Sequence, residues 1–322
     1  MSGPIIDISD LTRTFTVRRK ASTGRRRTTI AAVDQMTFAV QPGEAVGYIG
    51  ANGAGKSTTI KMLCGILVPT SGSVRTCGLE PVRQRRDLAR RIGVVFGQRS
   101  QLWWDLPLRE SFALLASIHQ LDPTRASART SELVDLLEMA DTLDTPVRQL
   151  SLGQRMRAEI AAALLHSPEL LILDEPTIGL DVLAKARLRE FLIHERATHG
   201  TTLLLTTHDM GDVERLCDRI LVVDRGRLAY DGTLPGLART VGARRVLVVD
   251  LAAPCAALTG VPNTTHLSSA ADGLRQHLAF DAERTTAAQV LAGIATEAEV
   301  RDLYIEEPDI EDVVRRIYQA QR

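Results

Sequence analysis

The sequence of 322 residues has few cysteines, few aromatic residues and no long apolar run. Its four cysteines are scattered, with no CxxC pair, which argues against a disulfide scaffold and against a structural metal site. No apolar run approaches the roughly 20 residues that cross a bilayer, and the opening segment MSGPIIDISD lacks a signal-peptide pattern. We therefore expect a protein that is cytosolic or is held at a membrane by other subunits.

The sequence also lacks an excess of charge, since 39 basic residues balance 39 acidic ones. This balance gives no global reason to expect nucleic acid as a partner. The local exception is the basic segment RRKASTGRRR (18–27), which we interpret as a solvated loop at a hairpin tip, with a phosphate- or lipid-binding patch as the alternative. Lysine is scarce, so a lysine at a special position is informative; the four are Lys20, Lys56, Lys61 and Lys185.

Apolar patterns in the first 232 residues alternate between strands and helices. Helical patterns cover 57–67 and most of 108–164. Strand followed by helix, repeated, predicts an α/β fold with a parallel sheet covered on both faces. The segments expected to form strands are 5–17, 36–49, 92–96, 170–175, 201–208 and the hairpin 220–232.

The character of the sequence changes after Gly232. Strands are expected at 244–251 and 274–281, separated by a loop rich in Ala, Thr and Pro. Residues 310–318 carry an apolar stripe at helical spacing. We therefore predict that residues 233–322 form a separate, small α/β module.

The clearest chemical pattern is a glycine-rich loop between a strand and a helix. GANGAGKSTT starts at Gly50 directly after an apolar run, and its spacing Gly-x4-Gly-Lys-Ser is the full phosphate-loop pattern. Such a loop turns its backbone N–H groups around a phosphate, and the following helix adds partial positive charge at its N-terminus. We expect Lys56 to bind the β- and γ-phosphates and the Ser57 hydroxyl to bind Mg²⁺.

A second apolar run, LLILDEP, ends in two adjacent carboxylates. Asp174 and Glu175 close a buried strand, which we place beside the phosphate-loop strand. Asp174 is suited to hold Mg²⁺ through water, and Glu175 to orient or deprotonate an attacking water. Because no base-reading motif of the GTPase kind is present, these patterns predict a nucleoside triphosphatase.

The segment LSLGQRMRAEI (150–160) opens an amphipathic helix that is rich in Arg and Ala. Ser151 followed by Gln154 three residues later is the pattern of a capping box. The free N–H groups of a helix N-terminus also favour an anion. Taken alone, the segment is best explained as a helix cap, and a cap is compatible with anion binding.

Together these motifs resemble the nucleotide-binding subunits of ABC transporters, over residues 1–232. The resemblance is specific because the motifs follow the family's order. It departs from the family at Leu152, where the signature usually has a glycine, and at Phe15, where tyrosine is the commoner adenine-stacking residue. The matching segments are Phe15, Gly50–Thr58, Gln98, Ser151–Gln154, Asp174–Glu175, Gly179–Asp181 and His208.

The resemblance implies an ABC-type P-loop NTPase with a RecA-like parallel-sheet core, an antiparallel β subdomain and an α-helical signature subdomain at about 99–165. It implies ATP and Mg²⁺ as cofactors, with Glu175 and His208 as catalytic residues. The metal candidates are Ser57, Gln98 and Asp174. The nucleotide-binding candidates are Phe15, Gly50, Asn52, Gly53, Ala54, Gly55, Lys56, Ser57, Thr58, Gln98, Ser151, Gly153, Gln154 and Asp181.

In this family the signature faces the γ-phosphate held by a partner subunit. A symmetric homodimer is therefore expected, with each ATP between one phosphate loop and the partner copy's signature. Gln98 would report the state of the nucleotide to the helical subdomain, and Asp181 would act across the dimer while also serving as a helix N-cap. Phe15 is either an adenine-stacking residue or a core residue of its strand.

The expected function is that of the ATP-hydrolysing subunit of an ABC transporter, on the cytoplasmic face of a membrane and bound to separate permease subunits. The 53 residues from Gln98 to Ser151 are too few for the long coiled coil of chromosome-maintenance relatives. A single phosphate loop argues against the tandem-cassette, ribosome-associated relatives. The basic segment, WWDLP, LSLGQ and EEPDIEDVVRRIY resemble ABC-2-type, NatA-like ATPases, which implies export.

Other interpretations stay open at this point. A soluble ABC-type ATPase acting on nucleic acid or ribosomes is supported only by the basic segment, so no nucleic acid is expected. A regulatory module that binds ATP and scarcely hydrolyses it is disfavoured by the complete set of catalytic residues. Trp103 and Trp104 are either core residues or a socket for permease helices. The module 233–322 is expected to serve in dimerisation or regulation.

Overall fold

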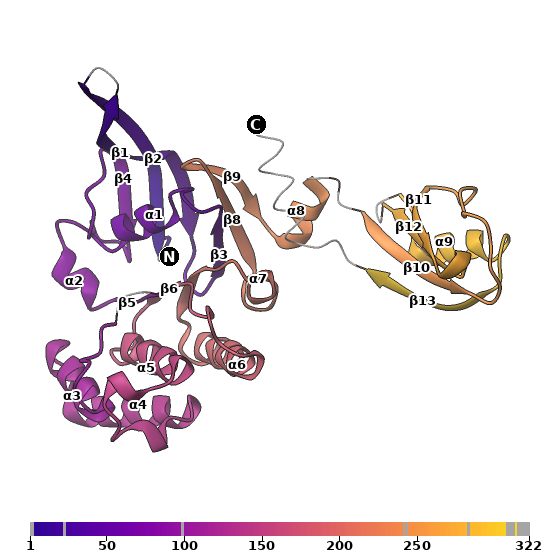
Figure 1. Cartoon of the computed structure of the whole chain (residues 1–322). Coiled ribbons are helices and arrows are strands. Elements are labelled where there is room, and N and C mark those ends of the chain that lie inside the picture. Colours follow the sequence, from indigo (N-terminus) through magenta and orange to yellow (C-terminus); the bar gives the residue numbers. More distant parts are fainter. Residues whose placement is uncertain are drawn as a thin grey trace. The chain divides into compact units, whose positions relative to one another are not determined.

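The computed structural model describes residues 3–21, 24–97, 100–240, 242, 244–281, 284–306 and 313 (Figure 1). The chain divides into two compact units, Met1–Gly232 and Thr233–Arg322. Within the described residues, no helix is both long enough and apolar enough to span a bilayer. The four cysteines are free, and burial raises the pKa of the thiols of Cys64, Cys77 and Cys217 to about 12.

A six-stranded sheet forms the centre of the first unit. The strands lie in the order β5-β6-β7-β3-β8-β9, and only the last pair is antiparallel. The predicted α/β fold with a parallel sheet is therefore confirmed. The strand bounds are β3 Ala45–Gly50, β5 Ile92–Phe96, β6 Leu170–Asp174, β7 Thr202–Thr206, β8 Arg219–Asp224 and β9 Arg227–Gly232.

Both faces of this sheet are covered, which explains why its strands read as continuous apolar runs. Successive residues of β6 point to opposite faces. Leu171 and Leu173 join a cluster with residues of α5 (Leu152–Leu164) and α6 (Val182–His199). Leu170 and Ile172 join a second cluster with residues of α1 (Lys56–Leu63) and of the antiparallel sheet. The parallel sheet thus lies between two apolar clusters, which hold the ends of its strands in place.

The antiparallel sheet of the first unit has the order β2-β1-β4, with β1 at Ile6–Ala21, β2 at Gly24–Val40 and β4 at Ser71–Thr76. The β1–β2 hairpin reaches beyond β4 (Figure 1). The expectation of a loop at 18–27 was wrong for most of the segment, because the strands stay paired from Arg18 opposite Arg27 to Ala21 opposite Gly24. Strand pairing therefore extends almost to the turn.

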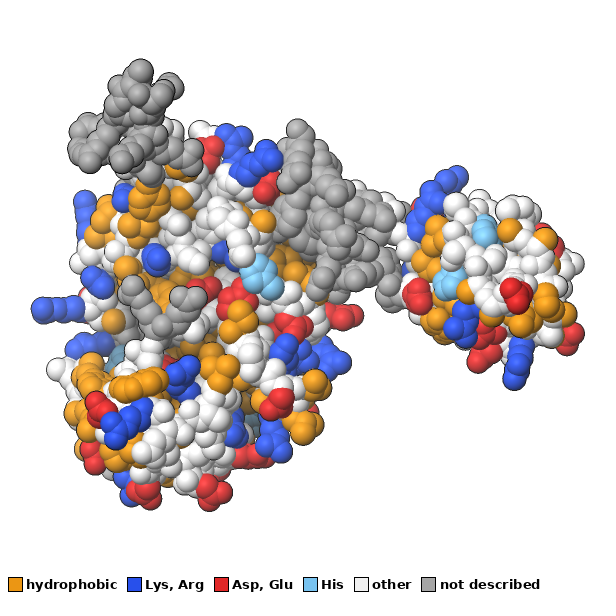
Figure 2. All heavy atoms as spheres, in the orientation of Figure 1, with side chains coloured by type: hydrophobic (Ala, Val, Ile, Leu, Met, Phe, Trp, Pro, Cys, Tyr) orange, Lys and Arg blue, Asp and Glu red, His pale blue; other side chains and the backbone are white. Residues whose placement is uncertain are grey.

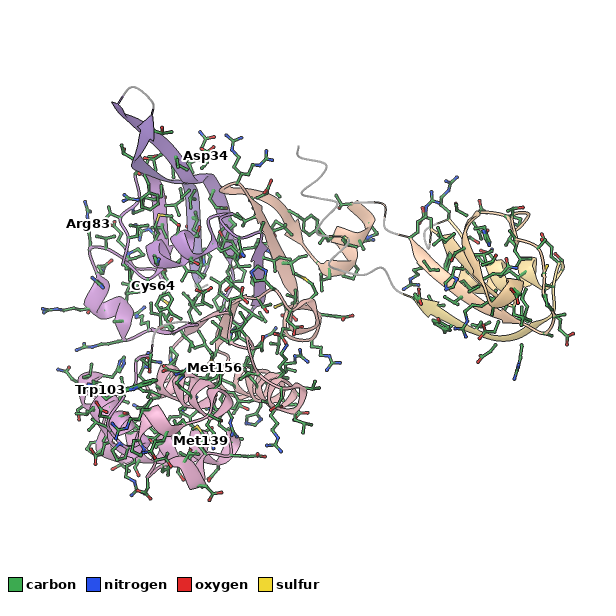
Figure 3. The ribbon with its side chains drawn as sticks, in the orientation of Figure 1. Asp34, Cys64, Arg83, Trp103, Met139 and Met156 are labelled. Atoms are coloured by element: carbon green, nitrogen blue, oxygen red, sulfur yellow. The ribbon has the colours of Figure 1, made fainter. Side chains whose placement is uncertain are left out.

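A helical region lies between β5 and β6, as predicted for about 99–165. It contains α3 (Leu108–Ile118), α4 (Pro123–Leu136) and α5. Met139 and Met156 are buried among these helices, while Trp103 lies at their outer edge (Figure 3). Hydrophobic side chains gather over this region on the face seen in Figure 2. The exposed ones include Trp103, Trp104, Leu114 and Ile118.

The core interpretation of the two tryptophans was wrong, since Trp103 is 37% and Trp104 is 50% exposed. The guanidinium carbon of Arg155, on α5, lies 5.6 Å from the centre of the Trp104 ring. A cation at this distance is within reach of a cation–π interaction. The remaining α-helices in the described part of the first unit are α2 (Arg85–Ala89) and α7 (Met210–Leu216).

The second unit contains a four-stranded antiparallel sheet in the order β11-β12-β10-β13. The expected strands correspond to β10 (Arg245–Leu251) and β12 (Arg275–Phe280), whereas β11 (Thr264–Ala270) and β13 (Val300–Glu306) were not predicted. Within the described residues of this unit, the longer helices are α8 (Leu234–Thr240) and α9 (Ala287–Ile294). Of the helix expected at 310–318, all but Val313 lies outside the described residues.

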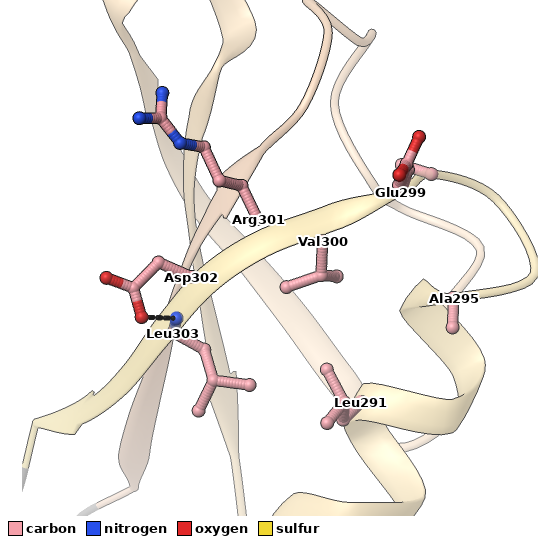
Figure 4. Close-up of a pocket in the computed structure, with 8 residues that line it drawn as sticks. Leu291, Ala295, Glu299, Val300, Arg301, Asp302 and Leu303 are labelled. Atoms are coloured by element: carbon pink, nitrogen blue, oxygen red, sulfur yellow. Dashed lines mark hydrogen bonds between the residues drawn. The ribbon is translucent and has the colours of Figure 1, made fainter.

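Residues of α9 and of the sheet share one apolar cluster, which includes Leu247, Val249, Leu278 and Val290. An open pocket of about 650 Å³ lies between α9 and β13 (Figure 4). Leu291 and Val300 point toward one another there, and Arg301 points away from the helix. The outward face of β13 is largely exposed.

Candidate functional site

The glycine-rich loop follows the end of β3 and leads into α1. Gly53 and Gly55 have φ angles of +83° and +105°, a region that favours glycine. A Cβ on Gly55 would lie 2.3 Å from the carbonyl oxygen of Ala32, and a Cβ on Gly50 would lie 2.6 Å from that of Val223. Both close approaches involve backbone, so the loop requires glycine at these positions.

The first residue of α1 is Lys56, which is only 8% exposed. Its Nζ donates hydrogen bonds to the carbonyl oxygens of Gly50, at 2.5 Å, and Ala51, at 3.4 Å. Burial lowers the pKa of Lys56, and the carboxylates of Glu175 and Asp174 oppose that shift. The ammonium therefore lies inside the loop, within the field of the two acidic residues. The Ser57 side chain is exposed beside it.

The two acidic residues follow β6, as the sequence predicts. Asp174 ends the strand and accepts a hydrogen bond of 2.5 Å from the Thr206 hydroxyl at the end of β7. Glu175 has a φ of +56°, which is unusual for a residue with a side chain. Its backbone N–H donates to the carbonyl oxygen of Thr206. Strained backbone of this kind clusters at functional sites.

His208 brings the ends of three segments together. Its Nε2 lies 3.2 Å from Glu175 Oε1 and 3.2 Å from Asn52 Oδ1. Its backbone N–H also donates to Glu175 Oε2, at 3.3 Å. Because β3, β6 and β7 are adjacent and parallel, their carboxyl ends deliver Asn52, Glu175 and His208 to one edge of the sheet. Ligand sites in open α/β sheets lie at such edges.

The signature forms the start of α5. The Ser151 hydroxyl accepts a hydrogen bond from the Gln154 N–H, and the Gln154 side chain accepts one from the Ser151 N–H. The predicted capping box is therefore confirmed. A Cβ on Gly153 would meet only Leu180 and Ala184, at 3.8 and 4.0 Å. The signature thus lies beside the loop that leads into α6.

That loop ends at Asp181, the N-cap of α6, whose side chain accepts a hydrogen bond from the Ala184 N–H at 2.8 Å. The expected N-cap is therefore confirmed. Among the described residues, no hydrogen bond or ion pair joins the group Asn52, Glu175 and His208 to the signature or to Asp181. The candidate residues fall into two separate groups on this chain.

Two further candidates have different outcomes. Phe15 on β1 is 37% exposed, so the alternative of a core residue was wrong. The guanidinium carbon of Arg13 lies 4.8 Å from the centre of the Phe15 ring, a neighbour that the sequence did not suggest. Gln98 lies outside the described residues, so its expected role stays a prediction.

The sequence analysis missed a buried polar cluster behind His208. Asp212 on α7 is fully buried and accepts hydrogen bonds from the side chains of Thr177 and Arg189. Asp209, the N-cap of α7, accepts one from Lys185. Two features of the sequence could have indicated this cluster: the scarcity of lysine, which makes Lys185 notable, and the Asp-x-x-Asp spacing of Asp209 and Asp212.

Comparison with known proteins identifies the family of the first unit. Residues 33–178 match the family model of ABC transporters. The chain is 38% identical over 218 residues, and 68% of that relative's length, to a daunorubicin resistance ATP-binding protein of Streptomyces coeruleorubidus. It is 31% identical over 233 residues to the ABC transporter ATP-binding protein NatA of Bacillus subtilis, covering 72% of this chain and 91% of NatA.

The Nod factor export ATP-binding protein I of Burkholderia thailandensis is 42% identical over 205 residues, and the match spans 62% of this chain and 65% of that relative. The match thus spans slightly less than two thirds of that relative's length. A solved structure of an ATP-binding subunit of an ABC transporter superposes with a TM-score of 0.63 at 29% identity, covering 74% of this chain and 94% of that one.

The fold is that of an ABC-type nucleotide-binding domain. The chain belongs to the ATP-binding proteins of ABC transporters, a family that hydrolyses ATP. The resemblance to NatA-like ATPases that the sequence suggested is confirmed by the match to NatA itself.

Proposed function

We propose that this chain is the ATP-hydrolysing subunit of an ABC exporter and acts as a homodimer on separate permease subunits. The observation that carries the proposal is the convergence of Asn52, Glu175 and His208 beside the buried ammonium of Lys56. A carboxylate and an imidazole within hydrogen-bond reach, next to a phosphate-binding loop, are groups suited to hydrolysis of the phosphoanhydride bond between the β- and γ-phosphates.

In the proposed reaction, Lys56 and the N–H groups of the loop bind the phosphates, and Phe15 stacks on the adenine. Glu175 orients the attacking water and accepts its proton. His208, held between Glu175 and Asn52, donates a hydrogen bond to the γ-phosphate. Each of these groups acts by position and charge, which is how protein groups accelerate phosphoryl transfer.

The donor set of this edge suits a magnesium ion. Ser57 supplies an exposed hydroxyl and Asp174 a carboxylate, both of them hard oxygen ligands. Gln98 is proposed as a further ligand. When bound, the ion would neutralise charge on the phosphates. Lys56 and the N–H groups of the loop then contribute the remaining positive charge.

Separation of the signature from the phosphate loop supports a two-chain site. At the N-terminus of α5 the Ser151 side chain is exposed and Gly153 is half-buried. The Gly153 N–H and the helix dipole suit an anion, which we propose is supplied by another chain. We therefore propose that the partner copy's ATP meets this helix end, with Asp181 acting across the dimer. A related bacterial ABC transporter cassette of 25% identity and TM-score 0.60 is described as dimeric.

The names of two relatives and two exposed tryptophans support the proposal of export through a permease. Two relatives are named for Nod factor export and for daunorubicin resistance. Trp103 and Trp104 directly follow the Gln98 segment and are exposed, as an anchor for another protein would be. We propose that they contact the permease, which places the protein at the cytoplasmic face of the membrane.

The test is a pull-down of tagged Glu175→Gln protein from detergent-solubilised native membranes, with ATP and Mg²⁺, analysed by mass spectrometry. We expect a multi-span membrane protein in stoichiometric amount. Replacing both Trp103 and Trp104 by serine should abolish its recovery, whereas Ile193→Ser, at an exposed position on α6, should not.

Two outcomes would overturn the proposal. Recovery of ribosomal proteins or nucleic acid without a membrane protein would favour the soluble ATPase. A wild-type protein that binds ATP but releases no phosphate, as inactive as Lys56→Ala, would favour a nucleotide-gated regulatory module.

A further inference from the structure

A fully buried carboxylate lies directly behind the proposed catalytic pair. Asp212 is on α7, four residues after His208, and is 0% exposed. The proposed reaction assigns it no part. A buried charge is costly unless it is paired and hydrogen-bonded, so the partners of Asp212 indicate what it holds in place.

The first partner comes from the Glu175 segment. The Thr177 hydroxyl, two residues after Glu175, donates a hydrogen bond of 2.5 Å to Asp212 Oδ2. Thr177 is itself only 3% exposed. Since Glu175 adopts a φ of +56°, contacts next to it must maintain that backbone conformation. Thr177 follows Glu175 by two residues and connects this segment to the charge of Asp212.

The second partner comes from the His208 segment. The Thr207 hydroxyl lies 3.5 Å from Asp212 Oδ2 and accepts a hydrogen bond of 3.0 Å from the Asp209 N–H. The Asp209 carboxylate accepts a hydrogen bond of 2.5 Å from Lys185, and this bond lowers the pKa of Asp209. His208 is therefore fixed on both sides, by Thr207 and by Asp209.

The third partner comes from α6. Arg189 donates from Nε to Asp212 Oδ1 at 2.6 Å, and its Nη2 pairs with the same oxygen. The side chain of Arg189 is 13% exposed, so this ion pair is largely screened from water. The N-cap of the same helix is Asp181. One carboxylate thus joins the segments that carry Glu175, His208 and Asp181.

We propose that Asp212 is a positioning residue for ATP hydrolysis, which sets the 3.2 Å separation between Glu175 and His208 and links it to α6. This inference rests on the proposed function. Charged groups hold a buried geometry more firmly than neutral ones. Small displacements of catalytic groups reduce rates strongly, so a residue that does not touch the nucleotide can still control the rate of hydrolysis.

The test measures steady-state ATP hydrolysis, ATP affinity and thermal unfolding of the full chain for two variants. Asp212→Asn removes the charge, and Thr177→Val removes only one hydroxyl while keeping the buried volume. We expect kcat to fall by about 10- to 100-fold in both, as for a displaced catalytic group. The Kd for ATP should stay within about twofold, because transition-state interactions alone are lost.

Two matched controls separate positioning from folding. Thr76→Val removes a fully buried hydroxyl that donates to the Leu63 carbonyl, away from the site. Asp218→Asn removes a carboxylate that pairs with Arg196 of the same helix α6. Both should retain wild-type kcat, even where the melting temperature falls.

The outcomes are distinct. An unchanged kcat in folded Thr177→Val, or losses of kcat that match the unfolded fraction in each variant and control, would overturn the positioning role. Wild-type protein that hydrolyses no ATP would instead overturn the proposed function and the inference with it. A drop in kcat at unchanged ATP affinity supports both.

Discussion

The δ2 methyl of Leu152 lies so close to Gly179 that a Cβ on the glycine would come within 2.6 Å of it. Leu152 stands where the signature usually has a glycine, and its side chain is 40% exposed. The missing side chain of Gly179 makes room for it. The signature and the loop before Asp181 are therefore packed against one another.

We predict that Gly179→Ala lowers ATP hydrolysis by displacing the signature. Gly179 has a φ of +73°, so alanine costs about 1 kcal/mol in backbone strain in addition to the contact with Leu152. The measurement is phosphate release, with thermal unfolding as a check on folding. We expect a loss of about tenfold, since the signature is proposed to bind the transferred phosphate.

The paired variant Leu152→Gly, Gly179→Ala isolates the steric part. Removing the leucine should restore part of the activity, and the double-mutant cycle gives the coupling between the two positions. Equal activity in Gly179→Ala and wild type would show that the contact does not position the signature.

Glu175→Gln should accumulate an ATP-bound dimer. The amide keeps the size of the side chain but cannot accept the proton of the attacking water. Light scattering after gel filtration with ATP and Mg²⁺ should give twice the monomer mass. Glu138→Gln, which removes an exposed carboxylate paired with Arg187, should hydrolyse ATP like wild type and not accumulate this dimer. A monomeric Glu175→Gln protein under these conditions would contradict the two-chain site.

Phe15→Ala should weaken ATP binding by about 5- to 150-fold, the range that loss of one base–aromatic stack gives. Phe15→Tyr should bind like wild type, because it keeps the ring. Ile30→Ala is the matched control, since Ile30 lies opposite Phe15 on β2 and is 44% exposed. Equal losses for Phe15→Ala and Ile30→Ala, measured by titration with a fluorescent ATP analogue, would argue against stacking.

Stability should fall as the pH drops below 6.5, because of His166. Burial, followed by the charge of His119 stacked 4.0 Å away, lowers the pKa of His166 to about 4. Its Nε2–H donates to the Ile92 carbonyl, and its Nδ1 has no hydrogen-bond partner within the described part of the chain. Between pH 6.5 and about 4 the unfolded chain therefore binds a proton that the folded chain does not, which destabilises the fold.

The loss should reach about 3 kcal/mol near pH 4, from 1.36 kcal/mol per pKa unit. Urea unfolding from pH 4.5 to 7.5 measures it. His166→Gln should flatten the pH dependence, whereas His194→Gln, at an exposed position on α6, should leave it unchanged. Identical slopes for wild type and His166→Gln would rule out His166 as the cause.

The strands and loops that hold the candidate site residues were predictable, because apolar periodicity and residue type both indicate the same structure there. The apolar run before Asp174 and Glu175 predicts a buried strand, and parallel strands deliver their carboxyl ends to one edge. The phosphate loop was predictable because the full Gly-x4-Gly-Lys-Ser pattern stands between an apolar strand and a helix. That the signature lies apart from this edge was predicted only by the family resemblance.

The elements and residues that the sequence analysis missed depend on tertiary contacts, which no local sequence pattern indicates. β11 reads TTHLSSA and β13 reads VRDLYIE, neither with the strong alternation of a half-buried strand. The hairpin at 18–27 reads as a loop because like charges usually stay solvated, yet backbone pairing continues through it. Asp212 gave little signal, since its burial depends on Thr177 and Arg189 from distant segments.

β13 stands at the edge of its sheet, where unpaired backbone groups can recruit a strand from another molecule. The carboxylate of Asp302 accepts a hydrogen bond of 2.8 Å from the Leu303 N–H. The Leu303 N–H is therefore already hydrogen-bonded. Leu303, Tyr304 and Ile305 of the same strand are exposed. This hydrogen bond leaves β13 one fewer free N–H group to offer to a strand of another molecule.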